Sequence, residues 1–145
     1  MPSPSRTREI ARHVGGPTYD ATTIAGTKAL TNADDGKTFL VSQAAAYTIS
    51  LPSISSVEKG WNATFSISVT GSNDVVVAPA SGDEDTMYGL KLDITDTVEI
   101  SDADSITFAS GASVLCDRLY AETDGTRWFV FAMSSANNGH SIADS

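Results

Sequence analysis

The stretch ASVLCDRLYAETDGTRWFVFA, residues 112–132, decides the fold. Asp-Gly at positions 124–125, between two runs rich in apolar residues, is the strongest short-range signal of a β-hairpin, because Gly adopts positive φ without steric cost. The pattern predicts two strands joined at residues 123–126. Both faces of the second strand are apolar: one carries Trp128, Val130 and Ala132, and the other carries Phe129, Phe131 and Met133. Such a hairpin belongs inside a sandwich, a barrel or a contact between subunits.

The composition fits one domain built from strands. The 145 residues are 41% hydrophobic and 19% charged, which is typical of a β protein with many small side chains. The formal net charge of −9 argues against nucleic acid as a partner, because phosphate neutralisation needs clustered Lys and Arg. No apolar run is long enough to cross a bilayer and no signal-peptide core lies near the start, so we expect no membrane partner and folding in a cytoplasm. The single cysteine, Cys116, is interpreted as a buried, inert thiol.

Residues 1–28 are interpreted as an extended N-terminal arm. Four basic residues against two acidic ones give this segment a charge of +2, which leaves −11 on the rest of the chain. Its apolar residues are too sparse to offset the entropy lost on ordering. Two interpretations stay open: a disordered tail, or an arm that orders against a partner.

Residues 29–134 are expected to form the β domain, and residues 135–145 a flexible C-terminal tail. From Thr38 onward the apolar residues recur with a period of two, and turn signals separate the runs. Residues 63–69 and 75–77 are predicted to form a second hairpin across the turn at 71–74. Eight or nine short strands without a helical period predict an all-β fold, a compact antiparallel β-sandwich or barrel of jelly-roll-like type.

No residue pattern supports catalysis. His13 and His140 are the only histidines, and each lies in a terminal segment without a nucleophile or carboxylate at a recognisable spacing. The acidic residues 83–85 lack the spacing of a calcium loop and are interpreted as a solvated face. We therefore expect no enzyme activity, no metal and no cofactor. Trp61, Tyr88 and Tyr120 could stack on sugar rings, although packing is the more common role of such aromatics.

A succession of turn and strand motifs suggests a family. It comprises Asp35-Gly36-Lys37-Thr38-Phe39, Tyr47-Thr48-Ile49-Ser50-Leu51-Pro52, Gly60-Trp61, Val75-Val76-Val77-Ala78-Pro79 and Asp124-Gly125-Thr126-Arg127-Trp128. Across about residues 31–133 the chain resembles small β domains of tailed-bacteriophage virion proteins, which occur in head decoration (cement) proteins, head fibres and tail fibres. The resemblance implies a homotrimer without enzymatic activity, located on the virion.

Among these roles, the size and the arm favour a capsid decoration protein. It would be made in the host cytoplasm, bind the major capsid protein on the exterior of the head and stabilise the shell. The expected capsid-binding arm residues are Arg6, Arg8, Ile10, Arg12 and Val14, and the expected residues of the core or subunit interface are Trp128, Phe129, Phe131 and Tyr120. The alternative is a short head- or tail-fibre or adaptor protein that binds host-surface glycan.

Overall fold

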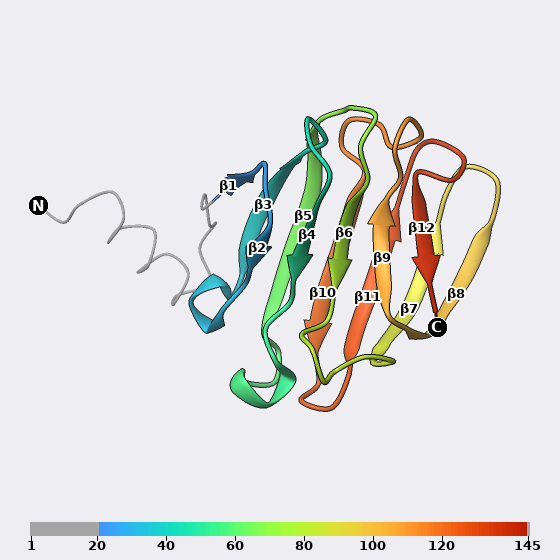
Figure 1. The fold of residues 1–145 in the computed structure, drawn as a ribbon. Coiled ribbons are helices and arrows are strands. Elements are labelled where there is room, and N and C mark those ends of the chain that lie inside the picture. Colours follow the sequence, from blue (N-terminus) through green and yellow to red (C-terminus); the bar gives the residue numbers. More distant parts are fainter. Residues whose placement is uncertain (1–20, 145) are drawn as a thin grey trace, which may run out of the picture.

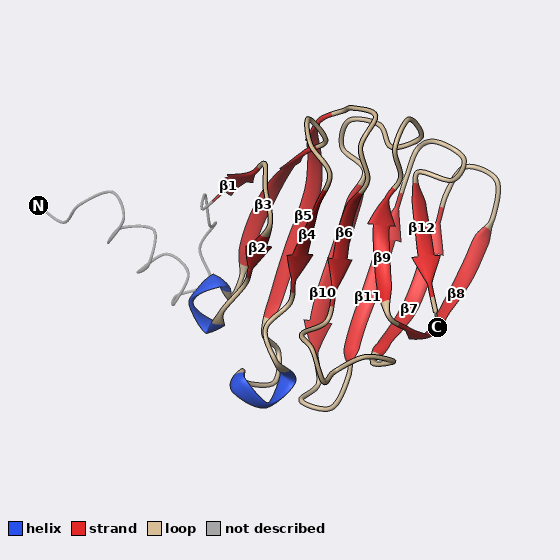
Figure 2. Ribbon diagram, in the orientation of Figure 1, coloured by secondary structure: helices blue, strands red, loops and turns tan. Residues whose placement is uncertain are grey.

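Two β-sheets make up the structure, a computed structural model that describes residues 21–144 (Figure 1). The larger sheet has seven strands in the order β1 (Ala21–Ile24), β3 (Lys37–Ser42), β5 (Asn62–Val69), β10 (Arg118–Thr123), β11 (Trp128–Met133), β7 (Met87–Leu92) and β8 (Thr97–Ala103). The smaller sheet has five, in the order β12 (His140–Ala143), β9 (Ser105–Phe108), β6 (Val75–Ala78), β4 (Tyr47–Ser50) and β2 (Lys28–Ala29). Two short 3-10 turns, Asn32–Asp34 and Ile54–Ser56, lie outside the sheets (Figure 2). The predicted all-β sandwich is confirmed.

The first six strands alternate between the two sheets. β1, β3 and β5 pair in parallel in the larger sheet, while β2, β4 and β6 pair in parallel in the smaller one. After each of these strands the chain therefore crosses to the opposite sheet. When it returns, it forms the next neighbouring strand of the first sheet, so the six strands form a coil. Because such returns keep the strand direction, the four pairings among these strands are parallel. The pairing of β7 with β11 is also parallel, so five of the ten pairings in the described chain are parallel. The expectation of an antiparallel sandwich was wrong in this respect, and both sheets are mixed.

The predicted second hairpin was also wrong, because β5 and β6 lie in different sheets. The buried side chain of Gln43 holds the connection between them in an arch. Its Nε2 lies 3.1 Å from the carbonyl oxygen of Asn73 and 3.2 Å from that of Phe108, and the Gly71 amide approaches its Oε1 at 3.4 Å. A Cβ on Gly71 would meet the Gln43 carbonyl oxygen at 2.2 Å, so this close approach needs glycine.

The central hairpin is confirmed, with a longer turn than Asp-Gly alone. Thr123 pairs with Trp128, so four residues form the loop, and Gly125 adopts φ 91°. The Asp124 Oδ1 accepts hydrogen bonds from the amides of Thr126 (2.8 Å) and Arg127 (2.9 Å). These bonds lower the pKa of the Asp124 carboxyl. The turn is therefore stabilised by the aspartate side chain together with the glycine backbone.

The core lies between the sheets and is rich in aromatic rings. Trp61 and Trp128 meet edge to face, with ring centroids 5.4 Å apart and an interplanar angle of 81°. Phe39 and Phe65 stack at 5.6 Å and 18°. All four side chains are at most 1% exposed, so the predicted core role of Trp128 is confirmed.

Both predicted ends of the domain need correction. β1 and the start of β2 fall inside the predicted arm, and Ile24 is buried, with its carbonyl oxygen 2.7 Å from the Tyr47 hydroxyl. At the other end, β12 pairs with β9 in what was predicted to be a flexible tail, and His140 is 1% exposed. Each segment gains backbone hydrogen bonds from a strand distant in sequence, which local composition does not reveal.

Candidate functional site

The outer face of the larger sheet carries a group of exposed and half-buried apolar and aromatic side chains. Tyr120 pairs with Phe131, and Phe131 pairs with Leu90, so these three residues lie in one row across β10, β11 and β7. Paired residues of adjacent strands point to the same side of a sheet. Rows on either side add the remaining members of a group that we call the apolar face: Tyr88, Leu90, Tyr120, Phe129, Phe131 and Met133.

Exposure separates this face from the core on the other side of the same strands. Phe129, Met133 and Leu90 are 45%, 44% and 39% exposed, whereas Trp128, Val130 and Ala132 of the same β11 are at most 3% exposed. The predicted two-faced character of β11 is confirmed. One side fills the sandwich interior, and the other is a surface that binding to a partner would cover.

Polar neighbours hold the aromatic rings of the apolar face in place. The Arg127 guanidinium lies over the Tyr88 ring, with its Cζ 5.6 Å from the centroid. The Tyr88 hydroxyl donates to the Asp102 carboxylate, and the Tyr120 hydroxyl donates to Glu122 Oε2 at 3.1 Å. Partial burial and the adjacent Glu122 carboxylate raise the pKa of Tyr120, so this hydroxyl remains protonated at neutral pH. The rings are therefore partly ordered before any partner binds.

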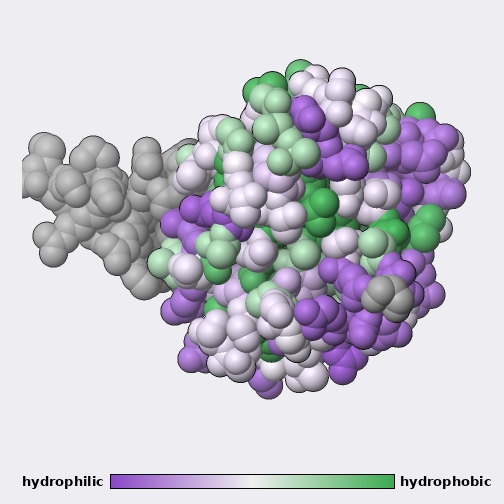
Figure 3. Space-filling model, in the orientation of Figure 1, coloured by the Kyte–Doolittle hydropathy of each residue, from purple (hydrophilic) through white to green (hydrophobic). Residues whose placement is uncertain are grey.

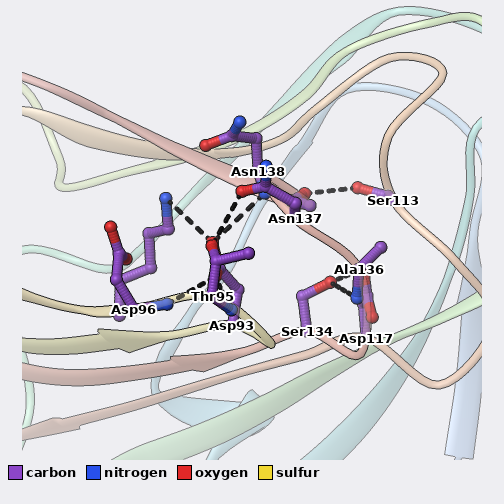
Figure 4. A network of polar contacts seen from close by, with 11 residues as sticks. Asp93, Thr95, Asp96, Ser113, Asp117, Ser134, Ala136, Asn137 and Asn138 are labelled. Carbon is purple, nitrogen blue, oxygen red and sulfur yellow. Dashed lines mark hydrogen bonds and ion pairs between the residues drawn. The ribbon is translucent and has the colours of Figure 1, made fainter.

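A second group of polar residues lies where loops meet at one end of the sandwich (Figure 4). Its first centre is Asp93, whose Oδ1 accepts from the Thr95 hydroxyl (2.6 Å) and amide (2.8 Å), and whose Oδ2 accepts from the Asn138 amide (3.1 Å). These bonds lower the pKa of Asp93. The buried Lys91 places its Nζ 3.5 Å from Asp93 Oδ2.

The second centre of this group is Asp117. Its Oδ2 accepts from the Val114 amide (2.9 Å) and the Ser134 hydroxyl (2.8 Å), and its Oδ1 accepts from the Ser135 amide (3.3 Å). A Cβ on Gly139 would lie 2.7 Å from Asp117 Oδ2 and 2.1 Å from Ser134 Oγ, so a side chain at this position would displace the two side chains that form the tie. Both aspartates therefore act as loop ties, and their carboxylate oxygens are occupied by backbone and hydroxyl donors.

His140 lies buried beneath these ties. Its ring packs against Phe108 at 4.9 Å, and neither ring nitrogen has a hydrogen-bond partner within the described chain. Burial lowers the pKa of His140 to about 4; Lys91 also lowers it, while Asp117 and Asp93 oppose this shift. The imidazole is therefore neutral at pH 7 and has no access to a substrate proton.

A surface groove of about 620 Å³ borders the same loops. Hydroxyl side chains, glycine backbone and two aliphatic side chains line it: Thr70, Gly71, Gly111, Ser113, Val114, Leu115 and Ser135. The lining contains no charged group, and the buried Ser113 hydroxyl already donates to the Gly139 carbonyl oxygen at 2.6 Å, so Thr70, Ser135 and the backbone are the groups that could bind a ligand here.

The expected site residues have different outcomes. Trp128 belongs to the core, while Phe129, Phe131 and Tyr120 come together on the apolar face. The arm residues Arg6, Arg8, Ile10, Arg12 and Val14 lie outside the described residues, as does His13.

Cys116 was expected to be buried in a strand, and this was wrong. It is exposed, adopts φ 72° and lies in the loop before β10, which begins only at Arg118. The structure also adds Tyr88 and Leu90 to the group around β11. Alternation in β7 marks them as strand residues, but only the parallel pairing of β7 with β11 brings them there.

Within residues 21–144, no group of three or more His, Cys, Asp or Glu side chains is placed to hold a metal ion. No helix in that part of the chain is long and apolar enough to cross a membrane. No protein-family model matches the chain, and no curated protein matches it in sequence.

Proposed function

We propose that the protein is a decoration (cement) protein of a tailed-bacteriophage head, which binds the shell exterior as a homotrimer and stabilises it. The observation that carries the proposal is the apolar face on the larger sheet, because an exposed aromatic surface of this kind is typical of proteins that act by assembly. The resemblance of residues 31–133 to virion β domains supports the choice of a phage particle.

The proposed partner on the shell is the major capsid protein, and the proposed contact is the N-terminal arm. Arg6, Arg8 and Arg12 carry planar donors that suit carboxylates on a partner, and Ile10 and Val14 would add a small apolar contact. The chain enters the body at β1, an edge strand of the larger sheet, so the preceding residues start from the rim of the domain. Three arms on one trimer would bind with high effective concentration, so a weak contact per arm is sufficient.

Co-sedimentation with shells that lack decoration tests this proposal. We expect the full-length protein to pellet with the shells, and a variant without residues 1–16 to stay folded and trimeric yet fail to bind. Replacing the three arginines with alanine should weaken binding and reduce its dependence on salt, since exposed ion pairs are screened beyond about 8 Å at physiological ionic strength. The matched control is Arg→Lys at all three positions, which keeps the charge. Undiminished binding by the truncated protein would place the capsid contact on the body.

The groove favours a second candidate function, binding of host-surface glycan by a short fibre or adaptor. Its hydroxyl and backbone groups suit a neutral polyhydroxyl ligand. Imaging of virions with and without the protein separates the two functions, because a decoration protein would appear as symmetric knobs on the head and an adaptor only at the tail.

A further inference from the structure

We infer that the apolar face is the surface through which copies of this chain contact one another. The inference deepens the proposed function, on which it rests for the trimeric state, and its occupant is a second copy of the same chain. The apolar face consists of the six residues defined above, on β7, β10 and β11.

Continuity distinguishes this face from other exposed apolar residues. Ile94, Leu115 and Val69 are 68%, 59% and 47% exposed, yet Ile94 and Leu115 lie in loops and Val69 ends β5. The members of the apolar face instead occupy alternate positions along three neighbouring strands, which lie about 4.8 Å apart. Single exposed apolar residues are normal on a soluble protein, whereas a contiguous group indicates a contact surface.

Charge points to a second copy as the occupant. The described residues hold 6 basic and 16 acidic side chains, a net charge of −10, so two copies repel each other over most of their surface. The apolar face is the exception, because both arginines of the described chain, Arg118 and Arg127, lie on its border. The same border carries Glu99, Asp102 and Glu122, together with Asp124, whose Oδ2 lies 3.6 Å from the Arg127 Nε. The border therefore carries charges of both signs, so the arginines of one copy can face carboxylates of a second copy.

The sheet also provides a rigid surface for a contact. Seven strands at about 4.8 Å spacing span about 29 Å, and six residues of a strand span about 20 Å. The flat outline of the whole outer face is thus about 600 Å², somewhat less than the roughly 800 Å² that each partner contributes to a standard interface, so a contact centred on the three apolar strands would also need the flanking strands and loops. Because Arg127 and Asp102 hold Tyr88 and Glu122 holds Tyr120, these two tyrosines lose less side-chain entropy on contact.

The test is the mass of the full-length protein by sedimentation velocity between about 1 and 100 μM. We expect the wild type to form an oligomer, and Phe129→Glu and Phe129→Lys each to weaken association at least tenfold. Charge of either sign should act alike, because the effect comes from burying a charge in an apolar contact. Leu90→Ser on the neighbouring strand is a second, milder variant. The matched control is Ile94→Glu, which puts the same charge on an exposed apolar residue outside the face and should leave the oligomer intact.

Denaturation of each variant shows whether it is folded, so that loss of the oligomer is not confused with unfolding. A wild-type monomer at 100 μM, or Phe129 variants with unchanged mass, would overturn the inference. If the wild type is monomeric and aggregates after removal of residues 1–20, the chain's own N-terminal segment covers the face instead. An intact oligomer that fails to bind shells would refute the proposed function and leave this contact surface standing.

Discussion

The outer faces of the two sheets differ sharply, although their inner faces are alike. On the larger sheet one row runs through Tyr120, Phe131 and Leu90. On the outer face of the smaller sheet the side chains are small and mostly polar. One row across this face consists of Thr48, Val76, Thr107 and Ser141. Figure 3 shows this second face, where pale and hydrophilic residues predominate. Formation of the core requires only the inner faces, so packing within the domain does not account for the aromatic outer face.

The sharpest comparison lies within β11, between adjacent residues on opposite sides of the larger sheet. Trp128→Ala should lower the free energy of unfolding by about 3–5 kcal/mol, because it removes a fully buried ring that packs on Trp61. Phe129→Ala should cost the monomer less than about 1 kcal/mol, since its side chain is 45% exposed. Urea denaturation under conditions that keep the chain monomeric measures both. Equal losses would mean that Phe129 also belongs to the core.

The free energy of unfolding should depend on pH through His140, which lies on the inner side of the smaller sheet. Its folded pKa of about 4 lies below the usual value near 6.5, so the unfolded chain binds the proton more readily. The stabilisation is complete above pH 6.5 and is lost as the pH falls towards 4, by up to about 3 kcal/mol. Denaturation midpoints between pH 7 and pH 4 measure this loss.

His140→Phe is the control for that pH dependence. It keeps an aromatic ring against Phe108 and removes two nitrogens that have no partner in the described chain, so stability should become nearly flat between pH 6.5 and 4.5. The carboxyls with lowered pKa, such as Asp34 and Asp93, lose their contribution only at more acidic pH, below this window. An unchanged slope in the variant would assign the acid sensitivity to another group.

The acidic loop before β7 provides a comparison of neighbours with different roles. It was interpreted as a solvated face, but Asp83 Oδ2 accepts a hydrogen bond of 2.8 Å from the Ile54 amide. Asp83→Ala should therefore lower the free energy of unfolding by about 1 kcal/mol, and Asp83→Asn, which keeps an acceptor, should lower it less.

Asp85 is exposed, and Asp104 raises its pKa, first through a side-chain hydrogen bond and then through charge repulsion. Asp85 adopts φ 59°, which Asn tolerates and Ala does not, so Asp85→Asn is the appropriate variant. It removes the charge and should leave the thermal midpoint unchanged or slightly higher; a large drop would show that the Asp85 carboxylate also ties this loop.

The sequence predicts those features of the fold whose signals are local. Asp124-Gly125 between alternating runs predicted the β10–β11 hairpin, and the period of two placed Trp128 and Phe129 on opposite faces of β11. Alternation does not reveal which apolar face is buried, because that depends on the sheet that packs against it. The six strands that coil between the sheets were missed for a related reason. A turn such as residues 71–74 suits both a hairpin and an arch, and the choice depends on Gln43, nearly thirty residues away.

The ends of the domain and the polar ties were missed because they depend on distant pairing. The segment containing β12 is small and polar, and nothing within it indicates that His140 packs on Phe108. Asp117 is a lone acid in the sequence, yet it binds the loop at 134–135. Tyr88 and Leu90 joined the apolar face only through the parallel pairing of β7 with β11. Each contact joins segments that lie far apart along the chain, where composition and period give no signal.

The smallest expected effect concerns the outer face of the smaller sheet. Thr107→Ala and Ser141→Ala remove hydroxyls from paired positions on β9 and β12, where Thr107 is half-buried and Ser141 is exposed. Each should change the free energy of unfolding by less than about 0.5 kcal/mol, because no core contact is lost. Neither should change the sedimentation mass, whereas Leu90→Ser at a comparable outward position of the larger sheet should. If Thr107→Ala dissociates the oligomer as strongly as Leu90→Ser does, the smaller sheet also takes part in assembly, and the contrast between the two outer faces would not explain which surface binds a partner.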